Sequence, residues 1–369
     1  MLMDTTGIST KDRILGCIMG GAIGDALGYQ CEFTRNIKER EYTTFADDYG
    51  IFSDDTQMML FTANALLWRN TYGTLNGEAP TPTECIRRAY HDWYRTQNGF
   101  ETNNQNISWI DKVPAMNHRR APGFTCIESL SHEEQGTIQK PINQSKGCGT
   151  TMRVAPIGLI AQNINDAIQV SAESAALTHG HPLAIISAAF LGGLYYEIMR
   201  DTTRNFSNQL HITFEFTNQF TTKNFHVQYQ NDFMKIMRKS FELSRNKSRD
   251  SENIRAIGEG WVAEEAVAIA IYCCLRHQDN FFDAVVSAVN HGGDSDSTGI
   301  IAGNIMGARY GIGAIPNYYV DHIEQKDLIL EIANDLADGV PYDNTHNPAN
   351  PAWDAKYINL TPPNLGEAA

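Results

Sequence analysis

Apolar residues recur every three or four positions along most of the chain, which is the spacing of helices with one buried face. Alternation of period two is scarce, and its best example is the short segment 211–216, which we expect to be a strand. The pattern therefore predicts an all-α fold, built as a single compact multi-helix domain. The expected helices cover residues 12–27, 56–69, 82–94, 166–177, 182–199, 232–244, 263–276, 281–289, 298–310 and 325–337.

The chain has no internal repeat and no evident linker, so one large domain over 11–340 fits its 369 residues best. A short leader, 1–10, precedes this domain. Residues 203–255 are rich in Asn, Gln, Ser, Thr, Lys and Arg, and we expect a variable insertion at the surface. The tail, 341–369, contains five prolines and is expected to wrap the surface as ordered coil.

Composition and charge narrow the functional classes. A hydrophobic content of 42% with 10% aromatic residues argues against disorder. Lys and Arg number 29 against 43 Asp and Glu, so the net charge is −14, which disfavours binding to nucleic acid. A phosphate-bearing ligand remains compatible, because backbone N–H groups and metal ions also bind phosphate.

The sequence also predicts a cytoplasmic protein without a membrane partner. No run of 18 apolar residues is present, and the first residues are too polar for a secretory signal. The seven cysteines include no CxxC pair, so we expect reduced thiols rather than a disulfide framework.

Two acidic clusters each open a predicted helix. Residues 53–56 read Ser-Asp-Asp-Thr, and residues 292–299 read Gly-Gly-Asp-Ser-Asp-Ser-Thr-Gly. Helix capping explains one acidic residue in each cluster, but it does not explain two glycines and alternate carboxylates together. Carboxylate and hydroxyl oxygens suit Mg²⁺, Mn²⁺ or Ca²⁺ better than zinc. Two such ions about 3.5–4 Å apart activate water and orient a polar substrate.

Four further features bear on function, and three of them have a structural alternative. Glycines recur from Gly16 to Gly28, which indicates close helix packing or an approach of backbone to ligand. The loop 146–151 (Lys-Gly-Cys-Gly-Thr-Thr) has N–H groups that could hold a phosphate, although it lacks P-loop spacing. Glu32 could be simply solvated, and His179 could simply contact the end of a helix dipole.

Six segments in order resemble the ADP-ribosylglycohydrolase family, which includes dinitrogenase reductase-activating glycohydrolase and ADP-ribosylarginine hydrolases. They span nearly all of 11–311. The segments are GCIMGGAIGDALGYQCEF (16–33), FSDDTQMML (52–60), KGCGTTMRVAPIG (146–158), LTHGHP (177–182), GEGWVAEEAVAIAIYC (258–273) and NHGGDSDSTGIIAGNIMGARYG (290–311).

The resemblance implies a binuclear centre of two Mg²⁺ or Mn²⁺ ions. Glu32 falls where some members place a required glutamate, and Asp55 would be both ligand and catalytic residue. Loop 146–151 matches less closely, since some members carry an aromatic residue and Asn-Gly where this chain has Lys146 and Cys148-Gly149. The implied metal ligands are Ser53, Asp54, Asp55, Asp294, Asp296 and Ser297. The implied substrate-binding residues are Lys146, Gly147, Cys148, Gly149, Thr150, Thr151 and His179.

The resulting hypothesis is hydrolysis of ADP-ribose from a modified protein side chain, with arginine as the favoured acceptor. ADP-ribosyl-serine and O-acetyl-ADP-ribose are alternative substrates. Such an enzyme could serve as an immunity protein against an ADP-ribosyltransferase toxin. The rival class is a protein without catalysis, which would bind ADP-ribose, block a toxin sterically or resemble a crystallin-like relative of the family.

Overall fold

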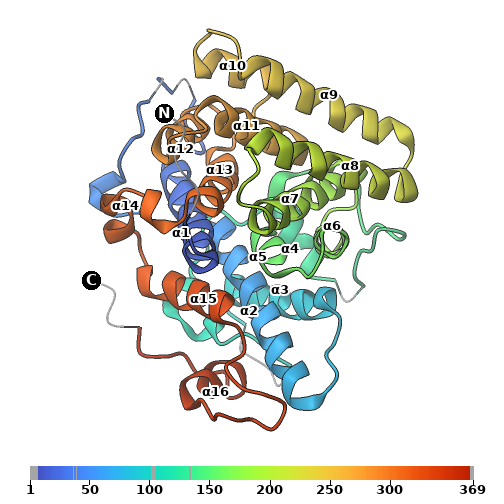
Figure 1. The fold of residues 1–369 in the computed structure, drawn as a ribbon, viewed down its shortest axis with the longest axis vertical. Coiled ribbons are helices and arrows are strands. Elements are labelled where there is room, and N and C mark those ends of the chain that lie inside the picture. Colours follow the sequence, from blue (N-terminus) through green and yellow to red (C-terminus); the bar gives the residue numbers. More distant parts are fainter. Residues whose placement is uncertain (1–6, 36, 39, 101–104, 133, 366–369) are drawn as a thin grey trace.

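The computed structural model describes residues 7–35, 37–38, 40–100, 105–132 and 134–365 (Figure 1). These residues form α-helices and short 3-10 turns, and they contain no β-strand. The α-helices are α1 (Thr10–Tyr29), α2 (Asp54–Asn76), α3 (Pro82–Asn98), α4 (Phe124–Leu130), α5 (Ala155–Ile160), α6 (Ile164–Ala176), α7 (Pro182–Arg200), α8 (Phe206–Asn224), α9 (Val227–Leu243), α10 (Asp250–Ile257), α11 (Ala263–Arg276), α12 (Phe281–Val289), α13 (Ser295–Tyr310), α14 (Asn317–His322), α15 (Lys326–Asp338) and α16 (Pro351–Tyr357).

The all-α prediction is confirmed, and each of the ten expected helices is present. Several of them begin a few residues earlier than expected, where a side chain caps the first turn. Ser9, for example, accepts a hydrogen bond from the backbone N–H of Asp12 at 3.0 Å, so α1 begins at Thr10. Of the expected leader 1–10, residues 1–6 lie outside the described part of the chain.

The expected strand at 211–216 is wrong, because this segment lies inside α8. The short alternation of apolar residues there is overridden by a longer helical spacing of the buried side chains. That spacing runs through Phe206, Leu210, Thr213, Phe214, Thr217, Phe220 and Thr221.

Segment 203–255 forms α8, α9 and α10, which lie along one side of the molecule (Figure 1). Part of this segment belongs to the hydrophobic core, where Phe206, Phe233 and Ile254 are buried. Whether the segment is variable among relatives stays a prediction. The tail differs from the expected coil at one place, because α16 buries Trp353 and Tyr357 against the rest of the molecule.

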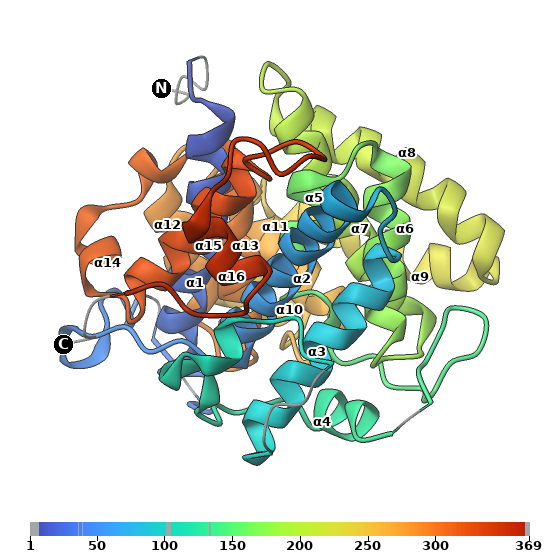
Figure 2. The same cartoon turned by 90° about the horizontal axis from the view of Figure 1, so that it is seen from below.

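Helices α1 and α13 lie side by side in the centre of the molecule (Figures 1 and 2). A Cβ atom on Gly24 would lie 2.0 Å from the carbonyl oxygen of Gly299, so the two backbones touch. The helices run in opposite directions, and this brings the end of α1 and the start of α13 together. The facing pairs are Gly16 with Gly307, Gly20 with Gly303, Gly24 with Gly299 and Gly28 with Ser295.

Helices α7 and α11 complete the core, and almost every side chain of α11 is buried. By length and composition α7 could also cross a membrane, but 83% of its apolar window is buried inside the molecule, as it is in a core helix. The length and composition of α7 are therefore weak evidence for a membrane span.

Candidate active site

The start of α2 is held by a buried carboxylate that the sequence motifs did not single out. Asp25 is fully buried in α1 and accepts hydrogen bonds from the N–H groups of Ser53 (3.0 Å) and Thr56 (2.9 Å) and from the Thr56 hydroxyl (2.5 Å). Burial first, and then the neighbouring Asp296, raises the pKa of Asp25 to about 7. Asp25 is the one charged residue of α1 beyond its first turn, and this was the signal that could have identified it.

The two acidic clusters meet. The Ser297 hydroxyl donates a hydrogen bond to Asp55 Oδ2 at 2.8 Å, which joins the start of α13 to the start of α2. Glu32, from the turn after α1, joins them, and carboxylate oxygens of Glu32, Asp294 and Asp296 lie within 4.8 Å of one another. The structure thus brings Glu32 and both predicted ligand groups into one site, hereafter the acidic cluster, formed by Glu32, Ser53, Asp54, Asp55, Asp294, Asp296 and Ser297.

One glycine of the second acidic cluster, Gly293, is explained by close packing of the backbone. A Cβ atom on Gly293 would lie 1.8 Å from the carbonyl oxygen of Glu259. The N–H of Asp294 donates to the same carbonyl oxygen at 2.8 Å. Gly293 therefore lets the segment before α11 approach closely and fix Asp294 at the start of α13.

The acidic cluster fits a divalent cation on electrostatic grounds. Each of its side chains is more than nine-tenths buried, and no lysine or arginine of the described residues forms an ion pair with its carboxylates. Burial and then the repulsion of Asp296 raise the pKa values of Asp54, Asp55 and Asp294 well above their ordinary range.

Glu32 completes this fit. Burial and then the neighbouring carboxylates of Asp296 and Asp294 raise its pKa to about 10. Its Oε2 atom is buried without a hydrogen-bond partner among the described residues. An all-oxygen group of uncompensated carboxylates is the donor set of Mg²⁺ or Mn²⁺.

Loop 146–151 lies against the acidic cluster. The thiol of Cys148 is 2.6 Å from Asp294 Oδ2, and it also interacts with Ser297. The 3-10 turn η4 (Cys148–Thr150) begins here, and the first N–H groups of any helix have no partner within it. Lys146 points elsewhere, because its ammonium group pairs with Glu264. Thr150 and Thr151 are buried, and their hydroxyls donate to backbone carbonyls.

His179 flanks this loop. A Cβ atom on Gly147 would lie 3.1 Å from His179 Nε2, and one on Gly149 would lie 3.2 Å from the same ring. Burial and then the charge of Arg153 lower the pKa of His179 to about 3, so the ring is neutral at physiological pH. Its Nδ1 is 2.8 Å from the Thr178 hydroxyl.

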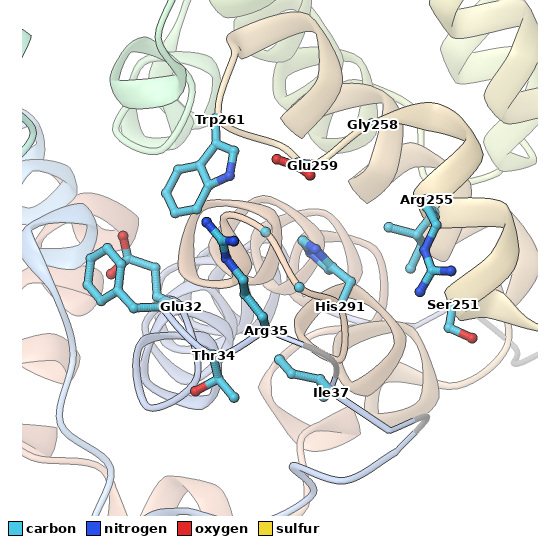
Figure 3. A pocket seen from close by; sticks show the side chains of 14 residues that line it. Glu32, Thr34, Arg35, Ile37, Ser251, Arg255, Gly258, Glu259, Trp261 and His291 are labelled. Atoms are coloured by element: carbon cyan, nitrogen blue, oxygen red, sulfur yellow. The ribbon is translucent and has the colours of Figure 1, made fainter.

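A cavity of about 540 Å³ opens on another side of the acidic cluster (Figure 3). Glu32 and Gly293 belong to its wall, whereas no residue of loop 146–151 does. Phe33 and Trp261 stack at its edge with ring centroids 6.4 Å apart and an interplanar angle of 18°. The sequence motifs indicated no role for these two rings, for Glu259 or for the two arginines of the cavity wall, Arg35 and Arg255, since their placement depends on how distant segments meet.

The fold and the site define an all-α protein with a buried, oxygen-lined site suited to divalent cations. The profile of the ADP-ribosylglycohydrolase family matches residues 6–344. The chain therefore belongs to this family, as the sequence motifs implied. The family is metal-dependent, and the acidic cluster is the candidate metal centre of this chain.

Individual relatives are distant but cover most of the chain. The ADP-ribosyl-[dinitrogen reductase] glycohydrolase of Rhodospirillum rubrum is 24% identical over 345 residues, covering 87% of this chain and 93% of the relative. The ADP-ribosylarginine hydrolase Tri1 of Serratia proteamaculans is 22% identical, covering 88% and 79%. A solved structure described as an ADP-ribosylglycohydrolase-related protein complex shares the fold, with a TM-score of 0.62, 23% identity and coverage of 89% and 98%.

Proposed function

We propose that this protein is an ADP-ribosylarginine hydrolase that depends on two Mg²⁺ or Mn²⁺ ions. Water would cleave the bond between C1″ of ADP-ribose and a guanidino nitrogen of the modified arginine, releasing ADP-ribose and the unmodified side chain. The observation that carries the proposal is the meeting of both acidic clusters and Glu32 in one buried site of an ADP-ribosylglycohydrolase family member.

The acidic cluster would hold the ions through Ser53, Asp54, Asp55, Asp294, Asp296 and Ser297. When bound, the ions would supply positive charge that orients the ribose hydroxyls and increases the acidity of water. Asp25 would position this group by fixing the start of α2, where Ser53 and Thr56 bind its carboxylate.

Glu32 would act in proton transfer. It is the member of the acidic cluster that also lines the open cavity, so it can reach a substrate (Figure 3). Its raised pKa would be lowered by bound cations, which keep it ionised, and its carboxylate would then accept a proton from the attacking water and return it to the leaving nitrogen. The N–H groups of loop 146–151 would hold the diphosphate, with the neutral ring of His179 beside them.

Two observations support arginine as the acceptor. A relative named ADP-ribosylarginine hydrolase matches over most of the chain. Glu259 lines the same cavity as Glu32, and its exposed carboxylate has no ion pair or hydrogen bond with the described residues. A carboxylate at this place would pair with a guanidinium group but has no such partner in serine.

The test measures free ADP-ribose released from an ADP-ribosyl-arginine protein, with Mg²⁺, with Mn²⁺ and with EDTA, beside an ADP-ribosyl-serine protein. We expect metal-dependent release from arginine alone. Release only from serine would overturn the acceptor while keeping the enzyme class, and O-acetyl-ADP-ribose is tested in the same way.

The absence of release from every substrate, despite bound metal, would favour the non-catalytic alternative. A role as an immunity protein against an ADP-ribosyltransferase toxin is the biological setting that we propose. Cells that express the toxin would survive with the wild-type chain and not with Asp55→Ala. Survival with that variant would instead indicate steric blocking of the toxin.

A further inference from the structure

The cavity beside Glu32 contains two arginines that form no ion pair with the described residues. Arg35 follows α1, and Arg255 belongs to α10. Both side chains are exposed, and neither forms an ion pair or hydrogen bond with any residue in the described ranges. The neighbouring arginines are paired, since Arg249 contacts Glu252 at 2.6 Å and Arg276 contacts Asp250 at 3.6 Å.

These two charges stand out in a chain with a net charge of −14. Figure 3 shows Arg35 and Arg255 on opposite sides of His291 in the cavity wall. Burial lowers the pKa of His291 to about 4, so this ring adds no charge between them at neutral pH. Anionic groups that enter the cavity would therefore meet two guanidinium groups that are not held in ion pairs with the described residues.

The position of the cavity indicates which part of a substrate reaches it. A substrate of the proposed function has ADP-ribose on one side of the reacting bond and the acceptor on the other. The loop suited to the diphosphate, 146–151, is absent from the cavity wall, whereas Glu32 and Gly293 belong to it. The acceptor side of the bond would therefore face the cavity.

We propose that this cavity binds the acceptor segment of the modified protein, and that Arg35 and Arg255 select segments with a carboxylate next to the modified arginine. The inference rests on the proposed function and adds a substrate preference to it. The volume of about 540 Å³ suits one side chain with its immediate neighbours rather than a folded domain.

The polar segment 203–255 would contribute to binding of the acceptor. Ser251, Ile254 and Arg255 all come from α10 and form the side of the cavity away from Glu32. The reacting groups come from the matched family motifs, whereas this part of the acceptor site comes from a segment in which we found no motif. Acceptor preference can thus differ between relatives without a change in the acidic cluster.

The experiment compares two ADP-ribosyl-arginine peptides that differ only in Asp or Asn beside the modified residue. With wild-type enzyme we expect the KM for the Asp peptide to be about two- to fivefold lower, as one partly exposed ion pair with either arginine allows. Arg35→Gln with Arg255→Gln should bring this ratio close to one. Arg238→Gln, which removes an exposed arginine of α9 outside the cavity, should keep the wild-type ratio.

Equal KM values for the two peptides in the wild type, or a preference that survives the double substitution, would overturn the inference. Anisotropy of the labelled peptides in EDTA measures the same preference without turnover. Failure of the proposed function is distinguishable, because the peptides would then release no ADP-ribose while their binding still reports on the two arginines.

Discussion

At the scale of single residues, Asp55 lies where the two acidic clusters meet, and its Oδ2 accepts the Ser297 hydroxyl at 2.8 Å. Asp55→Ala would remove a carboxylate from the proposed ligand set. We expect ADP-ribose release to fall at least about 100-fold, in line with a lost reacting or metal-holding group. The measurement pairs this assay with Mn²⁺ titration calorimetry, which should show weakened binding.

The helical circular dichroism of Asp55→Ala should stay near that of the wild type, because α2 keeps its cap at Ser53 and its contacts with Asp25. Asp232→Ala, at an exposed position of α9, is the control for loss of a carboxylate. Full metal-dependent turnover in Asp55→Ala would show that the site is assigned wrongly.

Cys148 allows a second prediction at this scale. It is half-buried, whereas the other six cysteines are buried, so N-ethylmaleimide should modify Cys148 first. Its thiol lies 2.6 Å from Asp294 Oδ2, and a cation held by Asp294 would restrict access to it. We expect Mn²⁺ to slow this modification several-fold, as followed by mass spectrometry of the labelled peptides. An unchanged rate at saturating Mn²⁺ would contradict a cation site at Asp294.

The site residues divide into those that the sequence could identify and those that it could not. Asp54 and Asp294 stand in conspicuous acidic motifs at helix starts, so their chemistry was visible in the sequence. Asp25 looked like part of a helix face, and its function depends on contacts with Ser53 and Thr56 about 30 positions away. Trp261 and Arg255 belong to the site only because α10, α11 and the turn after α1 converge there.

At the scale of elements, the contact between α1 and α13 determines whether the acidic cluster forms. Gly24→Ala would place a methyl group 2.0 Å from the carbonyl oxygen of Gly299, and neither backbone can yield without separating the helices. We expect a loss of about 1–3 kcal/mol or more in the free energy of unfolding, measured by urea denaturation. Activity should fall as well, because Glu32 and Asp294 lie at the end of this contact.

Gly313→Ala is the matched control, because a Cβ atom there would meet no atom within 4 Å. Its stability should stay within about 0.5 kcal/mol of the wild type. Equal stability of the two variants would mean that α1 and α13 are less closely packed than described.

The helices themselves were largely predictable, since spacing of apolar residues and helix propensity are local properties. The wrong prediction of a strand inside α8 shows that a pattern of only six residues can mislead. Residues 211–216 alternate like a strand, but the buried face of α8 is defined by Phe206, Leu210 and Phe220, which lie outside or at the edge of such a window. The glycines of α1 indicated either helix packing or a nearby ligand, and only their partners in α13 decide for packing.

At the scale of the whole molecule, the buried carboxylates should make the stability of the cation-free protein fall as pH rises. The folded-state pKa is raised to about 7 for Asp25 and about 10 for Glu32, above the values of about 4 expected in the unfolded chain. The unfolded chain therefore loses these protons first. The contribution of these two groups to the free energy of unfolding is fully present below about pH 4. It is lost progressively as the pH rises from there to about 7 for Asp25 and to about 10 for Glu32.

We expect thermal unfolding in EDTA to show a midpoint that declines from pH 5 to pH 8, and saturating Mn²⁺ to remove much of the decline by binding the ionised cluster. The net charge of −14 produces some decline of its own, so Glu32→Gln separates the two effects. This variant should melt higher than the wild type at pH 8 in EDTA, because it no longer has to bury an ionisable group without a cation. It should also gain less from Mn²⁺. A midpoint below that of the wild type in EDTA at pH 8 would mean that Glu32 is compensated in the folded protein without any cation.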